Sequence, residues 1–464
     1  MSLQYRSSTG QCNIAPARRN PEHPSLMNLP IPEIRRPPGP DDPLAPGIDR
    51  ETLILLQELQ ADYGNVVSMR TTRRDAIFIN DADEVRRLLV RHHGKYRKGP
   101  GFERVKMLLG NGLIVSDGAT WRRSRTMIQP AFSRQNVHRL IGLMVSCCEK
   151  RVATWEEIAR GAGQINITQE MSDFALELIL RATFGPDYEN SIVQEGSNPF
   201  SFLSRDSTRD LRVVMQLREL RQLLLNIIAA RRNSASSDYY DFLSIYLSAS
   251  DKNGNKFSDD ELLDELMTLI VAGYETSAGT LNWAWYLLAR NADAEQELLV
   301  EARAMIPEAA KVDAATLADM SYAQQLLEET LRLYPPVWLF TRRAEQDDSL
   351  ANFDVPAGSD IYLSPYVLHR TAEYWADPDA FDPQRFGPDS QYKKGDRPYF
   401  PFSLGPRRCL GEYFSFLEMK VHLGLLVQRF HMTLVADEQP ELDLGINLRS
   451  LNDILLRPEL RENP

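Results

Sequence analysis

One long helix constrains the fold of this chain more than any other segment. The run Ser258-Asp259-Asp260-Glu261 is a capping box, in which the side chains of Ser258 and Glu261 each accept a backbone N–H at the start of a helix. Helical periodicity continues to about Arg290, a length of roughly 48 Å at about 1.5 Å per residue. A helix of that length crosses a whole domain, so the rest of the fold has to be built around it.

The remaining sequence predicts a mainly α-helical domain with a minor β portion, an α+β fold. The periodicity is mostly helical from Asp83 to about Arg332, and short strands and proline-rich loops follow. No Gly/Ser-rich linker or internal repeat divides residues 49–464, which we predict to be a single domain. Residues 1–48, rich in proline and arginine, predict an extended or disordered arm. The first expected elements are a helix over Arg50–Tyr63 and strands over Asn65–Arg70 and Ala76–Asn80.

Charge and cysteine content restrict the class of protein. The formal net charge is −11 and the pI is near 5.3, which argues against nucleic acid as a general partner. Cys12, Cys147, Cys148 and Cys409 form no disulfide framework, which favours a reducing compartment. No stretch reaches the roughly 18 apolar residues of a membrane span, and the first residues lack the apolar region of a signal peptide. We therefore predict a cytoplasmic protein with no transmembrane segment.

A lone cysteine on a glycine-containing loop is the strongest functional signal. Phe402 to Gly411 read F-S-L-G-P-R-R-C-L-G, and a helix-forming run follows Cys409. The N–H groups that open that helix, here those of Leu410 and Gly411, stabilise a thiolate together with the nearby arginines. A single thiolate with no second cysteine nearby suits haem iron. Taken alone, Cys409 reads as a buried structural thiol, but the whole ten-residue pattern outweighs that interpretation.

The pattern F-x-x-G-x-R-x-C-x-G resembles the haem-binding loop of the cytochrome P-450 family, the haem-thiolate monooxygenases, in its soluble bacterial-type form. The resemblance implies haem b as the cofactor, with Cys409 as the axial ligand of its iron. It also implies that Phe402, Gly405, Arg407 and Gly411 surround the cofactor. The fold it implies is a single P-450-type domain with the long helix above the haem.

The middle of the long helix, Ala272-Gly273-Tyr274-Glu275-Thr276, resembles the oxygen-activation motif of that family. A threonine hydroxyl can bond to the carbonyl one turn back and open a local groove. An adjacent carboxylate can relay protons from solvent, and the glycine marks a place where another group approaches the helix closely. We predict Ala272, Gly273, Glu275 and Thr276 as the catalytic group; taken alone, a helix with one polar edge is the alternative.

An E-x-x-R pair predicts how the cysteine loop is supported. Glu329 and Arg332 lie one helical turn apart, and Tyr334-Pro335-Pro336 ends their helix. In the family these two residues join a later arginine, here Arg385, in a buried ion network under the loop. We assign these three residues to structure and not to chemistry.

Cations are predicted to hold the two propionates of haem, because the arginine fork suits carboxylates. The family pattern W-x-x-x-R places Trp121 and Arg125 there. Arg342 resembles a second propionate arginine, with Arg343 as a close competitor. His369 resembles a further position near a propionate.

Electrons are expected from a separate protein, because no flavin or iron–sulfur module is fused to the haem region. The expected donor is of the ferredoxin or flavodoxin type, with its reductase. A cluster of cations on the cysteine side would suit the docking of an acidic partner on this acidic protein; scattered, solvated cations are an equal alternative. The residues of this predicted cluster are Arg122, Arg123, Arg407, Arg408 and Lys420.

A set of mostly apolar residues predicts the substrate pocket by analogy with the family, and therefore a lipophilic small molecule as substrate. Each of these residues fits an ordinary core position equally well. The predicted set is Phe102, Val105, Leu109, Phe200, Phe202, Met267, Ile270, Val271, Trp338, Leu339 and Leu451, the last from the segment Leu448–Leu451.

Together these features predict a monooxygenase that uses dioxygen and two electrons to hydroxylate or epoxidise a lipophilic molecule. Two alternatives remain: a peroxygenase of the same fold driven by hydrogen peroxide, and a non-catalytic haem-binding sensor. Neither alternative requires the Glu275–Thr276 pair, so its presence argues for the monooxygenase.

Overall fold

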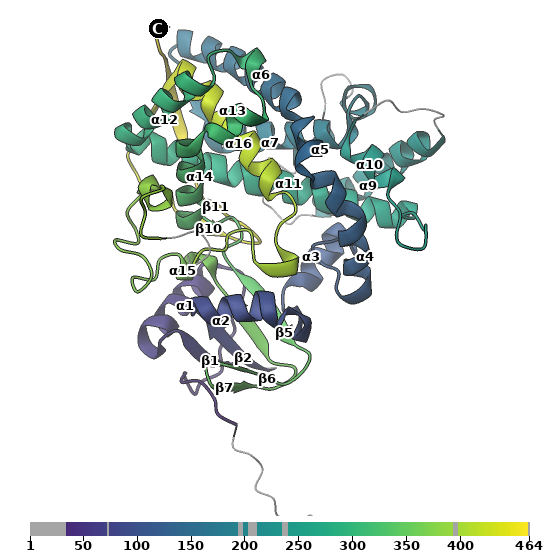
Figure 1. The fold of residues 1–464 in the computed structure, drawn as a ribbon, viewed down its shortest axis with the longest axis vertical. Coiled ribbons are helices and arrows are strands. Elements are labelled where there is room, and N and C mark those ends of the chain that lie inside the picture. Colours follow the sequence, from purple (N-terminus) through teal and green to yellow (C-terminus); the bar gives the residue numbers. More distant parts are fainter. Residues whose placement is uncertain are drawn as a thin grey trace, which may run out of the picture. The chain divides into compact units, whose positions relative to one another are not determined.

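The computed structural model describes residues 34–71, 74–193, 198–202, 211–233, 240–392 and 398–462. The chain divides into two compact units, residues 1–35 and 36–464, and the second holds the elements given below. In this unit helices dominate and the largest sheet lies at one end (Figure 1). The predicted α+β class, with a minor β portion, is confirmed.

The described helices follow the predicted distribution along the chain. They are α1 (Arg50–Tyr63), α2 (Ala82–Arg86), α3 (Phe102–Leu109), α4 (Gly118–Ile128), α5 (Arg134–His138), α6 (Ile141–Arg160), α7 (Ile167–Phe184), α9 (Leu211–Asn233), α10 (Phe242–Ser248), α11 (Asp259–Arg290), α12 (Ala292–Met305), α13 (Ala314–Asp319), α14 (Ser321–Leu333), α15 (Pro365–Leu368) and α16 (Glu412–Arg429). Short 3₁₀ or π turns are η1 (Arg87–Arg91), η2 (His93–Lys95), η3 (Gln129–Phe132), η4 (Tyr188–Ile192), η5 (Ala309–Lys311), η6 (Pro383–Phe386) and η7 (Gly405–Arg407).

The strands form one five-stranded sheet, of order β1-β2-β8-β5-β3, and three smaller sheets, β4-β12-β9, β6-β7 and β10-β11. In the largest sheet β3 pairs antiparallel with β5, which sets Lys98 opposite Arg342. The strands are β1 (Val66–Arg70), β2 (Asp75–Ile79), β3 (Tyr96–Lys98), β4 (Ile165–Asn166), β5 (Phe340–Ala344), β6 (Asp348–Leu350), β7 (Phe353–Val355), β8 (Asp360–Leu363), β9 (Phe430–Leu434), β10 (Leu442–Leu444), β11 (Leu448–Ser450) and β12 (Leu455–Leu460).

The long helix α11 begins and ends where the sequence predicts. Ser258 accepts the N–H of Glu261, and the Glu261 side chain accepts the N–H of Ser258, so the capping box is present on both sides. The helix packs most extensively against α7 and also contacts α14 and α16. Trp283 and Trp285 of α11 are fully buried. This packing makes α11 the central element on which the candidate site is built.

The folded unit begins earlier than predicted. Residues 1–33, most of the predicted arm, lie outside the described residues. The N–H of Ser68 donates to the Pro38 carbonyl at 2.8 Å, and the N–H of Leu44 donates to the Arg70 carbonyl at 2.6 Å. Residues from about 36 onward therefore lie along β1 and belong to the folded unit. In the part of the chain that is described, no helix is both long and apolar enough to cross a membrane.

Candidate functional site

The loop that carries Cys409 is a tight turn in front of α16. The N–H of Cys409 donates to the Phe402 carbonyl at 2.9 Å. Gly405 has a φ of 67°, and a Cβ at this position would collide with the carbonyl oxygen of Leu89 in η1. Only glycine fits there. The group that closely approaches Gly405 is thus the backbone of η1.

The sulfur of Cys409 is accessible and yet surrounded by protein. Its side chain is exposed, while burial among protein atoms raises the pKa of the thiol. The N–H groups of Gly411 and Glu412 and the guanidinium of Arg125 act in the opposite direction and stabilise the thiolate. Gly411 is one of the two expected donors, and Glu412 takes the place expected for Leu410. A sulfur in this setting can ligate a metal.

Three cations gather around one carboxylate next to this loop. Arg407 forms an ion pair with Asp117, and its guanidinium lies 4.2 Å from the centroid of the Trp121 ring. Arg342 is 6% exposed, and burial, followed by the charge of Arg407, lowers its pKa to about 10. The pKa of Lys98 is also lowered, mainly by burial and then by the charges of Arg342 and Arg407. Among the described residues Asp117 is the carboxylate that acts on these cations, so the cluster fits a ligand that brings further carboxylates.

Lys98 is a member of this cluster that sequence reasoning misses. It lies on β3, where Tyr96-Arg97-Lys98 reads as an ordinary alternating strand. Its partner Arg342 is far away in the chain, and only the β3–β5 register brings the two together. A sequence signal for Lys98 would have required knowledge of this strand pairing.

Arg342 and Arg343, the two predicted alternatives, have different partners. Arg343 forms two bonds to the carboxylate of Asp360, at 2.7 and 3.1 Å, so its charge is neutralised. Arg342 is the one that joins Lys98 and Arg407. On the other side of the loop, Arg125 donates to a backbone carbonyl beside Cys409, that of Arg408, at 2.8 Å.

His369, predicted near a propionate, packs against the segment that leads into the cysteine loop. Its side chain is fully buried, and Nε2 accepts the N–H of Phe400 at 3.0 Å. Burial is the main cause that lowers its pKa well below the ordinary value, and the charges of Arg332 and Arg370 act in the same direction. The imidazole is thus engaged with the backbone of Phe400, and its position near a propionate stays a prediction. This histidine belongs to the support under the cysteine loop.

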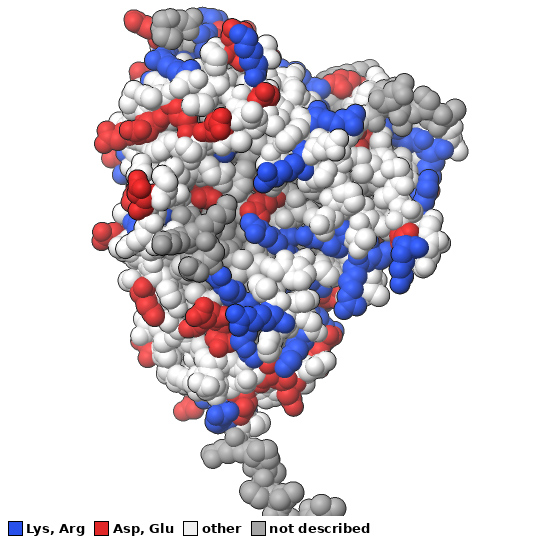
Figure 2. Space-filling view, in the orientation of Figure 1, with Lys and Arg blue, Asp and Glu red and all other residues white. Residues whose placement is uncertain are grey.

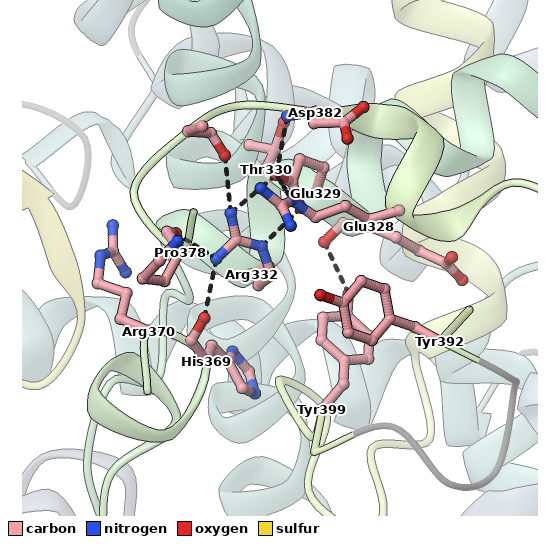
Figure 3. Close-up of polar contacts among 12 residues, drawn as sticks. Glu328, Glu329, Thr330, Arg332, His369, Arg370, Pro378, Asp382, Tyr392 and Tyr399 are labelled. Carbon is pink, nitrogen blue, oxygen red and sulfur yellow. Dashed lines mark hydrogen bonds and ion pairs between the residues drawn. The ribbon is translucent and has the colours of Figure 1, made fainter. Parts of the chain in front are cut away.

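Glu329 and Arg332 form a buried ion pair (Figure 3). Arg385 joins them in one network. Nε and Nη2 of Arg332 donate to the two oxygens of Glu329 at 2.6 and 2.8 Å. The Nε of Arg385 lies 3.4 Å from Glu329 Oε1. Glu329 and Arg332 have no exposed surface, and both of their charges are neutralised within the network.

The same network reaches the cysteine loop through backbone groups. Arg332 also donates to the carbonyls of His369, Pro378 and Ala380, at 2.8, 2.6 and 3.0 Å. The imidazole of His369 in turn accepts the N–H of Phe400, two residues before Phe402. The guanidinium thus ties α14 to the segment that leads into the loop.

The middle of α11 has the predicted local geometry at Thr276. Its Oγ1 donates to the Ala272 carbonyl, one turn back, at 2.7 Å. The neighbouring Glu275 forms an ion pair with Arg449 of β11, which is 40% exposed. A hydroxyl bonded into the helix thus lies beside a carboxylate whose partner reaches solvent.

Gly273 makes room for a neighbouring helix. A Cβ at this position would lie 2.8 Å from Cδ1 and Cγ1 of Ile179, which belongs to α7. The expected close approach is present, but the group that approaches is this aliphatic side chain. Gly273 therefore sets the α7–α11 packing.

Comparison with known proteins agrees with this geometry. Residues 46–458 match the family model "Cytochrome P-450". The chain is 33% identical over 403 residues to cyclooctatin synthase of Streptomyces melanosporofaciens, covering 82% of this chain and 86% of that one. It is 27% identical to pentalenene oxygenase of Streptomyces avermitilis, covering 84% and 88%. The crystallised haem domain of cytochrome P-450DA matches with a TM-score of 0.81 at 22% identity, covering 92% and 99%.

The chain belongs to the cytochrome P-450 family. It is a monooxygenase with haem b as its cofactor. The residues present fit that group: an accessible sulfur with N–H donors at Cys409, and a cluster of cations in excess of carboxylates at Lys98, Arg342 and Arg407.

In this P-450 several predicted pocket residues are ordinary core. Phe200, Met267, Ile270 and Trp338 have no exposed surface, and the indole of Trp338 donates to the carbonyl of Gly445. Leu109 and Phe202 are buried as well, whereas Leu451 is 58% exposed and faces solvent. These seven residues pack in the core or face solvent in this structure, and their place in a substrate pocket stays a prediction. The half-buried candidates that remain are Phe102, Val105, Val271 and Leu339.

The predicted basic cluster of the P-450 is also smaller than expected. Lys420 is buried, and its Nζ donates to the Leu317 carbonyl at 2.9 Å. Arg407 forms an ion pair with Asp117, and Arg123 forms ion pairs with two carboxylates of other segments. Lys420 is therefore not a surface cation, and the charges of Arg407 and Arg123 are balanced by these carboxylates. Figure 2 nevertheless shows Lys and Arg gathered on the face where α16 and α4 lie in Figure 1.

Glu418 is a buried acid outside the motifs that the sequence shows. It lies on α16, is 1% exposed, and bonds to Ser277, the neighbour of Thr276 on α11. Its Oε1 has no hydrogen-bond partner among the described residues. Burial raises the pKa of Glu418 to about 8. At neutral pH the neutral carboxyl thus links the cysteine helix to the helix of Thr276.

The pH dependence of stability tests this protonated state. The folded protein keeps a proton on Glu418 that the unfolded chain releases above about pH 4.5. Its contribution to stability is therefore complete below that pH and is lost as the pH rises to about 8. As the pH rises from 5 to 8, we expect the free energy of unfolding of the wild type to fall relative to that of Glu418→Gln. The fall is at most about 1.4 kcal/mol per pH unit. Urea unfolding from pH 5 to 8 measures this, with the exposed Glu58→Gln as control; equal slopes for wild type and Glu418→Gln would contradict it.

Proposed function

We propose that this P-450 hydroxylates or epoxidises a lipophilic small molecule with dioxygen and with electrons from a separate ferredoxin- or flavodoxin-type donor. The observation that carries the proposal is the Glu275–Thr276 turn of α11, with its hydroxyl bonded to Ala272 and its carboxylate paired to Arg449. A peroxygenase or a haem sensor needs no such relay. The monooxygenase is therefore the function that this geometry supports best.

In this proposal, residues from distant segments of the chain hold the cofactor. Haem, when bound, supplies the chemistry of dioxygen activation, and a thiolate ligand favours O–O cleavage. Cys409 ligates the iron through its sulfur. Lys98, Arg342 and Arg407 bind the propionate carboxylates, with Trp121 packed under the Arg407 guanidinium.

Residues of α11 supply the protons. The Glu275 carboxylate exchanges protons with solvent at the Arg449 end of its ion pair. The Thr276 hydroxyl, which already uses its own proton for the Ala272 carbonyl, offers its oxygen lone pairs to a water or to oxygen-derived groups in the groove. The two side chains thus form a relay of one carboxylate and one hydroxyl.

Removal of the Thr276 hydroxyl tests the relay. In Thr276→Ala we expect NADPH consumption to continue while product formed per NADPH falls about tenfold or more, because the hydroxyl oxygen that positions the proton-delivering water is lost. Product and NADPH are measured with a supplied ferredoxin system. The control is Thr183→Ala on α7, which removes the same kind of bond, from Thr183 Oγ1 to the Ile179 carbonyl. Unchanged coupling in Thr276→Ala would mean that the relay is wrong.

A comparison of oxidants separates the two catalytic alternatives. The monooxygenase should turn over with NADPH and the ferredoxin system and only weakly with hydrogen peroxide alone. The reverse result would identify a peroxygenase. The substrate class is approached by a screen of lipophilic compounds for a spin-state shift, beginning with pentalenene, the molecule named for one relative.

The electron donor docks in this proposal on the face that holds the start of α16. Arg122 and Arg134 are exposed there, and neither has an ion-pair partner among the described residues. The guanidinium of Arg134 lies over the ring of Tyr413, four residues beyond Cys409, at 5.1 Å. Arg408 is 55% exposed but is paired with Glu412. An excess of positive charge near the thiolate suits an acidic redox protein.

Charge reversal on this face tests the docking site. In Arg122→Glu we expect the KM for ferredoxin to rise several-fold and to depend less steeply on salt, while kcat changes little, because rim charges act mainly on association. The control is Arg70→Glu, an exposed arginine of β1. Equal effects of the two substitutions would place the docking site elsewhere.

A further inference from the structure

The loop of residues 110–117, between α3 and α4, is fastened to α11 by two consecutive carboxylates. Asp264 Oδ2 accepts the N–H of Asn111 at 2.8 Å, and Glu265 Oε2 accepts the N–H of Leu113 at 2.9 Å. A Cβ on Gly112 would collide with Thr268 Oγ1 and with the carbonyl oxygen of Asp264. The loop backbone therefore lies directly on α11, and its position depends on this stretch of the helix.

The other end of the same loop holds the cations of the haem site. The carbonyl of Ser116 accepts Nη1 of Arg407 at 2.9 Å, and the carboxylate of Asp117 forms an ion pair with Arg407. Asp117 Oδ2 also accepts the backbone N–H of Lys98 at 3.0 Å. Asp117 stands at the N-cap of α4 but does not cap that helix with its side chain. Its carboxylate is committed to Arg407 and Lys98.

Glu265 is the buried support of this arrangement. It is 3% exposed, and it accepts from Ser124 of α4 as well as from Leu113. Its charged neighbours on α11 are the carboxylates of Asp264 and Glu261, and the buried Tyr246 hydroxyl of α10 is also near.

The nearest cations serve other carboxylates. Arg221 of α9 pairs with Asp264, and Arg123 of α4 pairs with Glu261. Glu265 thus has two hydrogen-bond donors and no cation among the described residues. Burial raises the pKa of Glu265 to about 7, and Ser124 and Leu113 offset part of this effect.

We infer that Glu265 is a positioning residue for the cofactor: by seating residues 110–117 on α11, it fixes the Asp117–Arg407 pair that receives a haem carboxylate. The inference rests on the proposed placement of the haem carboxylates at Lys98, Arg342 and Arg407. The ionised carboxylate accepts from both Leu113 and Ser124. The protonated form has one fully free acceptor oxygen, so one of the two donors loses its partner.

Haem transfer to excess apomyoglobin measures how firmly the cofactor is held, independently of turnover. Wild type and Glu265→Gln are compared as ferric holoproteins from pH 5.5 to 8.5. The amide keeps the size and one acceptor oxygen but does not titrate. We expect Glu265→Gln to release haem several-fold faster than wild type at pH 8.5 and at the same rate at pH 5.5. The ratio of the two haem-release rates cancels the contributions of Cys409 and the propionates, which both proteins share.

Two further variants test whether the effect passes through Asp117 and whether it is specific to Glu265. In an Asp117→Asn background the ratio should fall to about one at every pH, because the effect passes through Asp117. Asp264→Asn, the adjacent carboxylate, should keep the shape of the wild-type pH profile. A ratio that does not change with pH, or that persists in Asp117→Asn, would overturn the inference. If the carbon monoxide complex of wild type lacked the thiolate band, the haem assignment itself would fail, and the two failures are thereby distinguished.

Discussion

Replacement of Cys409 by serine is expected to remove the red-shifted Soret band of the reduced carbon monoxide complex. A hydroxyl does not supply the electron density of a thiolate. Burial raises the pKa of the Cys409 thiol, and the N–H groups of Gly411 and Glu412 and the charge of Arg125 offset part of this effect. Monooxygenase turnover should fall by more than the roughly 10- to 100-fold that loss of a supporting residue costs at a metal site.

Cys147→Ala provides the matched control for this substitution. Cys147 is a buried thiol of α6, and burial raises its pKa to about 12, so it stays protonated at neutral pH. We expect its carbon monoxide spectrum to equal that of wild type. Circular dichroism of Cys409→Ser establishes whether the fold is kept. A folded Cys409→Ser protein that retained the thiolate band would refute Cys409 as the iron ligand.

The substitution Arg332→Ala is expected to have the largest effect on stability. It leaves the buried Glu329 with the N–H of Asp382 and the longer contact to Arg385 but without its main cation, and it removes the donors to three backbone carbonyls. Loss of one partner of a buried ion pair costs about 3–5 kcal/mol, a large part of the roughly 5–15 kcal/mol of a typical domain. We expect a strongly lowered Tm and poor retention of haem, because the same network reaches Phe400 through His369.

Two comparisons make the Arg332 result specific. Lys311→Ala breaks the exposed pair with Glu308 and should cost at most about 1 kcal/mol. Arg332→Lys keeps the charge but not the planar fork, so it should lie between wild type and Arg332→Ala in urea unfolding. The intermediate variant also gives a measurement if Arg332→Ala does not accumulate. Equal stabilities of Arg332→Ala and Lys311→Ala would contradict a structural role for the network.

Local patterns predicted the elements that carry the site. The capping box at Ser258 marked the start of α11, and its periodicity marked the end at Arg290. The bond from Thr276 to Ala272 and the pair of Glu329 with Arg332 also followed from spacing alone. In each case the partners are three or four residues apart on one helix, where backbone geometry brings them together.

Contacts between distant segments were predicted less well. His369 and Lys420 were expected beside the haem and on the surface, and both are buried against other parts of the chain. Trp338 was expected in the pocket and lies in the core. The residue type leaves these alternatives open, because a histidine, a lysine or a tryptophan can serve either role. The neighbours contributed by other elements decide between them.

The sequence by itself therefore determined the family, the haem-thiolate chemistry and the helices that bear it, since these depend on motifs read along a few residues. The tertiary structure alone decided that Lys98 stands opposite Arg342, that Arg449 is the partner of Glu275, and that Glu265 seats the loop that reaches Arg407. Those pairs are separated by more than a hundred residues or depend on a shared loop. Their formation follows from strand register and helix packing, which no local pattern records.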